Sequence, residues 1–166
     1  MSNANDKMLC LVSTLNVLKL DFEIMNYNPL NYQIIDHTAD LGIVVKGANI
    51  KDLFVNAADA MMDLMVKADA SHKGAKRAVS VEAEDFPDLM VRWLGEILYL
   101  LDGEHLLVIS TEIQSISPMQ LQSTLRVVPF KRGHHEILRE IKAVTYHQIS
   151  VEKKNDGWEA RIIFDI

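Results

Sequence analysis

Residues 43–65, IVVKGANIKDLFVNAADAMMDLM, carry the pattern that decides the fold: an apolar strand, a short polar connection and an amphipathic helix. Apolar side chains recur every three or four positions after the connection, which places them on one face of a helix. Asn49 stands at the expected N-cap, because its side chain can accept a hydrogen bond from an otherwise unpaired backbone N–H. The stretch therefore predicts a capped helix whose core-facing residues are Leu53, Ala57, Met61, Leu64 and Met65.

The same pattern returns at an offset of 36 residues in residues 79–101, VSVEAEDFPDLMVRWLGEILYLL. Asp85 takes the place of Asn49 as the cap, Pro87 falls in the first turn, where a missing N–H costs nothing, and Gly103 follows the last turn. Any two strand–helix units share part of such a pattern. The matched positions favour two related modules that share one core, with the second helix facing it through Leu89, Trp93, Ile97 and Leu100.

The remaining apolar segments are rich in β-branched and aromatic residues, which is typical of strands. Asn155-Asp156-Gly157 predicts a hairpin turn between the last two, since Asp-Gly tolerates positive φ. The predicted class is α+β, a largely antiparallel sheet with two main helices packed on it. The expected strands are 32–36, 43–46, 79–82, 106–116, 121–130, 141–151 and 158–164.

Composition narrows the function classes. The chain has 166 residues, 49% of them hydrophobic and 24% charged, with a net charge of −6. This predicts an ordinary globular domain and argues against direct nucleic-acid binding, which relies on a surplus of Lys and Arg. Cys10 is the only cysteine, so no internal disulfide is expected and the cytoplasm is the predicted location.

The N-terminal residues are expected to lie outside the domain. The apolar stretch 8–18 is too short to span a bilayer, and it lacks the basic flank and cleavage site of a signal peptide. We expect residues 1–30 to be an extension, flexible or not native to the protein. Residues 31–166 are then the domain, with no association with a membrane.

Familiar catalytic motifs are absent: there is no Gly-rich phosphate loop, paired-Cys metal spacing, His-Glu-x-x-His or Gly-x-Ser-x-Gly elbow. Polar residues instead gather in the segment Asp36-His37-Thr38-Ala39-Asp40-Leu41-Gly42, between two expected strands. Such residues are common in turns, yet two carboxylates and an imidazole so close together are also typical of a site. The residues alone leave both interpretations open.

A second polar cluster is Lys142-Ala143-Val144-Thr145-Tyr146-His147. A strand here would place Lys142, Val144 and Tyr146 on one face and the alternate residues on the other. A Lys or His on a strand is more often a solvated side chain than a catalyst.

The chain ends on Asp165-Ile166, which sets a side-chain carboxylate beside the terminal one. Two anions so close repel each other unless they face solvent or share a cation. Oxygen-rich anionic sites select hard cations such as Ca²⁺, Mg²⁺ or Mn²⁺.

Together these segments resemble the archease family. The His37-Thr38-Ala39-Asp40 segment with a following Gly, the helix with Ala57-Ala58 and Ala60-Met61, the segment 141–147 and the ending Phe164-Asp165-Ile166 all match its pattern. The resemblance covers roughly residues 31–166. It implies a pair of interlocked strand–helix–strand–strand modules, in agreement with the repeat at 36 residues.

The resemblance also implies a function. Archeases act as non-enzymatic partners of the RtcB-type tRNA-splicing ligase, promoting its guanylylation and multiple turnover in tRNA splicing or RNA repair. It further implies one divalent cation, Ca²⁺ first and Mg²⁺ or Mn²⁺ as alternatives, held by Asp40, Asp165 and the terminal carboxylate of Ile166. His37, Lys142 and His147 are then expected near this site, on a surface that faces the partner.

Two other functions compete with this one. A small metal-dependent hydrolase would use Asp40 and Asp165 as ligands and His37 or His147 as a base. A pure binding module would act on another partner, such as a tRNA methyltransferase. The hydrolase predicts turnover by the isolated protein, whereas the other two predict none without a partner.

Overall fold

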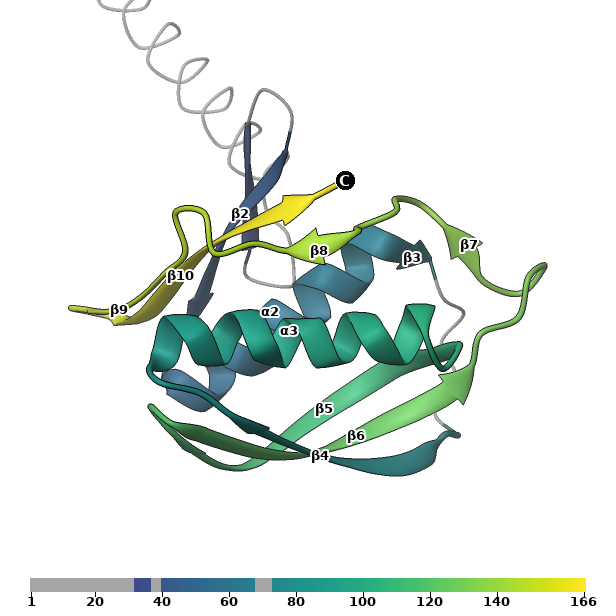
Figure 1. The fold of residues 1–166 in the computed structure, drawn as a ribbon, viewed down its shortest axis with the longest axis horizontal. Coiled ribbons are helices and arrows are strands. Elements are labelled where there is room, and N and C mark those ends of the chain that lie inside the picture. The colour runs from purple at the N-terminus through teal and green to yellow at the C-terminus, as the bar shows by residue number, and fades with distance from the viewer. Residues whose placement is uncertain (1–31, 37–39, 68–72) are drawn as a thin grey trace, which may run out of the picture.

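The computed structural model describes residues 32–36, 40–67 and 73–166. Two helices form a central layer between two sheets, and both helices contact both sheets (Figure 1). The helices are α2 (Ile50–Met65) and α3 (Phe86–Asp102). The larger sheet contains β1 (Tyr32–Asp36), β2 (Leu41–Gly47), β10 (Gly157–Asp165), β8 (Ala143–Val144) and β9 (Ser150–Lys154).

The smaller sheet lies on the opposite side of the helices (Figure 1). Its strand order is β4–β6–β5, and a separate two-stranded ladder pairs β3 with β7. Every pair of named strands is antiparallel. The bounds are β4 (Ala75–Glu82), β6 (Gln120–Pro129), β5 (Leu106–Ser117), β3 (Val66–Lys67) and β7 (Glu136–Ile137).

The α+β class and the two main helices are confirmed, but the single shared sheet that we expected is divided into two. The helices explain this division. Nine residues of α2 and nine of α3 are buried, far more than the one apolar stripe with which a helix covers a single sheet. Each helix therefore needs cover on two sides, and the two sheets provide it.

Both predicted N-caps are confirmed. Asn49 Oδ1 accepts a hydrogen bond from the backbone N–H of Asp52 at 3.0 Å, and Asp85 Oδ1 accepts one from Asp88 at 2.8 Å. Such caps each contribute about 1 kcal/mol to stability. The same cap geometry thus recurs at the offset of 36 residues found in the sequence.

The predicted core positions of both helices are buried. Trp93 is fully buried, and its indole N–H donates a hydrogen bond to the Phe54 carbonyl oxygen at 3.1 Å. This bond joins α3 to α2 and satisfies the one polar group of a large buried side chain. Within the described residues, no helix is long and apolar enough to cross a membrane.

The continuous strand predicted for 141–151 is wrong. β8 and β9 both pair with β10, but residues 145–149 leave the ladder between them, opposite Ile162 and Ile163. The backbone N–H and the hydroxyl of Thr145 both donate to the Ile163 carbonyl oxygen at 3.0 Å, and Gln148 adopts a φ of 53°. This local turn, which we call the bulge at 145–149, ends the expected alternation of faces after Val144.

The predicted turn at 155–157 joins β9 to β10, with Gly157 paired to Lys154. Gly157 has a φ of 143°, and a Cβ added there would lie 2.4 Å from the Gly47 carbonyl oxygen. Both the conformation and the close approach of β2 require glycine at this position.

We expect Gly157→Ala to lower the free energy of unfolding by about 3 kcal/mol or more, because it combines backbone strain with a collision against main-chain atoms. Gly133 is a matched control, since its φ is 95° but no described atom lies within 4 Å of its added Cβ. Gly133→Ala should cost only about 1 kcal/mol. Denaturant unfolding of both variants measures the difference, and equal losses would contradict the collision.

Candidate functional site

The register between β2 and β10 brings the two ends of the domain together. Leu41 pairs with Phe164 at the end of this ladder. Asp40 directly precedes Leu41 and Asp165 directly follows Phe164, so the two carboxylate residues occupy neighbouring positions at the same end of the sheet. Asp40 is half-buried and Asp165 is exposed. We call Asp40, Asp165, Ile166 and Lys142 the C-terminal edge.

Lys142 is tied to this edge twice. Its backbone N–H donates to the Asp165 carbonyl oxygen at 2.8 Å, and its ammonium group donates to an oxygen of Ile166 at 3.1 Å. The structure therefore brings Lys142 to Asp165 and Ile166, which were predicted from a different segment. The Lys142 ammonium offsets part of the negative charge here, and it would compete with a metal ion for the same Ile166 oxygen.

The edge offers an all-oxygen donor set. The side chains of Asp40 and Asp165 carry two carboxylates and the main chain of Ile166 carries oxygen, and oxygen donors are what hard divalent cations select. Within the described residues, no group of three or more His, Cys, Asp or Glu side chains lies together.

Of the two predicted histidines, only His147 lies among the described residues. His147 is exposed on the bulge at 145–149, beyond β8 and away from the regular ladder. His37 lies outside the described residues, as do Thr38 and Ala39 and the predicted boundary near residue 31.

The segment that follows Lys142 takes part in a cluster that sequence reasoning missed. The Tyr146 hydroxyl, on the same bulge, donates to Asp88 Oδ1 at 2.6 Å, and Arg92 Nε donates to both Asp88 oxygens at 2.9 Å. The backbone N–H of Glu84 also donates to Asp88, at 3.0 Å. The spacing of Asp88 and Arg92 predicts a helix pair, but nothing in the sequence indicates that Tyr146 joins it.

These contacts stabilise the ionised form of Asp88. The hydrogen bond from Arg92, then the one from Tyr146, then the one from the Glu84 backbone, lower the pKa of Asp88 to about 2. The same bond raises the pKa of Tyr146. The bulge that follows Lys142 is thus attached to the first turns of α3.

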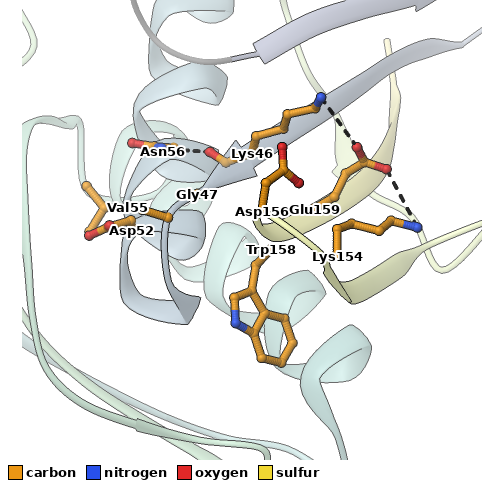
Figure 2. Close-up of a pocket in the computed structure, with 10 residues that line it drawn as sticks. Lys46, Gly47, Asp52, Val55, Asn56, Lys154, Asp156, Trp158 and Glu159 are labelled. Carbon is orange, nitrogen blue, oxygen red and sulfur yellow. Dashed lines mark hydrogen bonds and ion pairs between the residues drawn. The ribbon is translucent and has the colours of Figure 1, made fainter.

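A pocket of about 510 Å³ lies at the opposite end of β10, where the strand begins. Figure 2 shows Glu159 between two lysines, with Lys46 at 3.9 Å and Lys154 at 4.0 Å. The ring of Trp158 points away from these ion pairs and packs edge-on against Phe86, with centroids 5.5 Å apart. The nine residues of β10 span roughly 25–30 Å, so this pocket is separate from the C-terminal edge.

The comparisons with known proteins agree on one family. The model of the Archease protein family matches residues 32–166. Protein archease from Archaeoglobus fulgidus is 37% identical over 141 residues, which cover 82% of this chain and 100% of that protein.

Solved structures agree with this match. The solution structure of protein 1598 from Methanobacterium thermoautotrophicum is 30% identical, with a TM-score of 0.67 over 82% of this chain and 99% of that one. An archease from Thermotoga maritima, described as a possible chaperone, has a TM-score of 0.54 over 80% of this chain and 94% of that one. It is 17% identical and supports the fold alone.

Because the ionised form of Asp88 attaches the bulge to α3, the stability of the protein should depend on pH. A carboxyl whose folded pKa is lowered to about 2 from 3.8 contributes stability above pH 4 that is lost as the pH falls toward 2. Asp88→Asn should therefore lower the free energy of unfolding at pH 7, and its deficit relative to the unsubstituted protein should shrink between pH 4 and pH 2. Urea unfolding across this range measures it.

Glu96→Gln is the matched control, since Glu96 is an exposed carboxylate on the same helix that makes no hydrogen bond or ion pair with the described residues. Its unfolding should follow the unsubstituted protein at every pH. A deficit for Asp88→Asn that is constant with pH would mean that the charge of Asp88 does not hold the bulge.

Proposed function

Because this chain belongs to the archease family, we propose that it is a non-enzymatic activator of an RtcB-type RNA ligase. It promotes guanylylation of the ligase and multiple turnover in tRNA splicing or RNA repair. The observation that supports the proposal is the C-terminal edge, where Asp40 and Asp165 occupy neighbouring positions at the end of the β2–β10 ladder and Lys142 bonds to Ile166.

The charge of this edge suits a protein that contacts a charged partner. Three carboxylates and one ammonium group would leave a net charge of −2 at the end of the sheet, where Asp165 and Ile166 are exposed and Asp40 is half-buried. A divalent cation held by Asp40, Asp165 and the Ile166 carboxylate would neutralise this charge and offer a positive centre to the partner. Lys142 and His147 lie on the exposed segment beside it and supply contacts to the ligase.

The fold contributes to the proposed site by holding Asp165 in a defined position. Phe164 is fully buried and Asp165 follows it directly, so packing of the core determines where the carboxylate stands. The backbone bond from Lys142 to Asp165 orients the end of β10 from its other side. Groups held in this way keep their arrangement when a partner docks, which lowers the entropic cost of binding.

The proposal predicts that the protein raises the guanylylated fraction of a cognate RtcB-type ligase supplied with GTP and Mn²⁺, and permits multiple turnovers. Asp165→Asn should reduce this stimulation at least about tenfold, because it removes one charged donor. Asp156→Asn, an exposed carboxylate at the start of β10, should stimulate normally. Gel analysis of radiolabelled ligase–GMP measures the effect.

Unchanged guanylylation at stoichiometric amounts of the unsubstituted protein would refute activation. Nucleotide or phosphoester hydrolysis by the isolated protein would instead favour the metal-dependent hydrolase.

The proposed cation makes a separate prediction about stability. An ion that binds only the folded state stabilises it by about 2.7 kcal/mol at a hundredfold excess over its dissociation constant. We expect Ca²⁺ to raise the melting temperature of the protein, and amidation of the Ile166 carboxylate to abolish most of that rise. Scanning calorimetry with and without Ca²⁺ measures both.

Lys142→Ala is the control for this experiment. It removes the competing ammonium group and keeps all three carboxylates, so its rise with Ca²⁺ should equal or exceed that of the unsubstituted protein. An amidated protein that gains as much from Ca²⁺ as the free acid would show that the terminal carboxylate is not a ligand.

A further inference from the structure

The glycines of this chain differ in whether the fold itself requires glycine at their positions. All seven lie within the described residues, and six have an internal reason. At five of them an added Cβ would lie 2.6 Å or less from another atom, and Gly133 has a φ of 95°. Those five are Gly42, Gly47, Gly74, Gly103 and Gly157.

Gly95 has neither reason. It lies in the interior of α3, in right-handed helical conformation, and apart from its chain neighbours and the adjacent helix backbone no atom lies within 4 Å of the position that a Cβ would take. Glycine in the middle of a helix is less stable than alanine, because the unfolded chain loses more conformational freedom. The fold would therefore gain from a side chain here, and a reason for its absence must lie outside the chain.

The surface around Gly95 is an exposed stripe of α3. Arg92, Glu96 and Tyr99 share its face by helical spacing, and all three are exposed. In Figure 1 no other helix or strand crosses in front of the side of α3 that faces the viewer, and β8 lies along one flank of the helix. We call Arg92, Gly95, Glu96 and Tyr99 the α3 stripe.

Two exposed tyrosines flank this stripe. Tyr99 is 58% exposed and lies one turn after Gly95, and Tyr146 is 59% exposed and is held at the other end by its bond to Asp88. Asp88, which binds Tyr146, and Tyr99 are eleven residues apart, so their backbone positions are separated by about 16 Å along the helix. Tyr and Arg are the residues most enriched where protein partners bind tightly, and glycine lets another backbone approach closely.

We propose that the α3 stripe, with Tyr146, is a docking surface for a basic segment of a partner protein, whose backbone packs over Gly95 between the two tyrosines. The negative charge of the α3 stripe favours a basic segment over other partners. Arg92 is already paired with Asp88, whereas Glu96 makes no hydrogen bond or ion pair with the described residues. Asp102 adds a further exposed carboxylate at the end of the stripe.

The same charges disfavour other occupants. Nucleic acid would bring phosphates to a face with net negative charge. A second copy would bring another chain of charge −6, and one helix face is small beside the roughly 800 Å² per partner of a stable interface. A ligase that binds RNA must carry basic surfaces, so the inference rests on the proposed function and adds a second contact on α3 to the C-terminal edge.

The test titrates the RtcB-type ligase with variants of this protein and measures the concentration that gives half-maximal guanylylation. Gly95→Leu places a side chain where the partner backbone would lie and should raise that concentration at least about tenfold. Gly95→Ala should melt about 2–4 °C higher than the unsubstituted protein, because alanine favours the helix, and should also dock more weakly. Ala78→Leu, on the exposed face of β4 away from the helices, is the control and should change neither docking nor stimulation.

Each of the following outcomes would overturn the docking surface or change its occupant. Normal half-maximal concentrations for both Gly95 variants would overturn the docking surface and leave the proposed function standing, whereas no stimulation by the unsubstituted protein would overturn both. A lower melting temperature for Gly95→Ala would show that Gly95 has an internal role, which also overturns the inference. Sedimentation that finds a dimer dispersed by Gly95→Leu would assign the stripe to a second copy instead.

Discussion

The antiparallel pairing of β10 with β2 is the constraint on which the rest of the structure depends. Along β10, Ala160, Ile162 and Phe164 are fully buried in the core cluster, while the alternate residues face away from the helices. A slip of one residue would turn Arg161 toward the core and expose Phe164, so the register is strongly specified. Because this register is fixed, the positions of Asp40 and Asp165 at the end of the ladder are fixed with it.

The same strand separates two surfaces of different character. Its beginning carries ion pairs in which Lys46 and Lys154 both approach Glu159, and exposed pairs of this kind contribute little to stability. Its end carries three carboxylates against the single ammonium of Lys142. Glu159 at the beginning is thus paired with two lysines, whereas the negative charge at the end is offset in part by the Lys142 ammonium group.

Local sequence predicts the local parts of this fold. The caps at Asn49 and Asp85, the apolar faces of both helices and the turn at Gly157 each depend on a few neighbouring residues, and all are present in the structure. The bond from Tyr146 to Asp88 joins residues 58 apart and forms only because residues 145–149 leave the ladder. The division into two sheets depends in the same way on how both helices are covered at once. The site residues were indicated by resemblance, since spacing alone left Asp40 as either a ligand or a turn residue.

The bulge at 145–149 links these surfaces physically. It follows Lys142, which bonds to the last two residues of the chain, and it carries Tyr146, which bonds to the first turns of α3. A displacement of the bulge would have to break a charge-assisted hydrogen bond at α3 or strain the short β8 ladder of only two pairs. Thr145 bonds twice to Ile163, and the backbone of Lys142 bonds to Asp165. The sheet therefore holds Lys142 directly, and the bond from Tyr146 to Asp88 adds a second attachment four residues further along the chain.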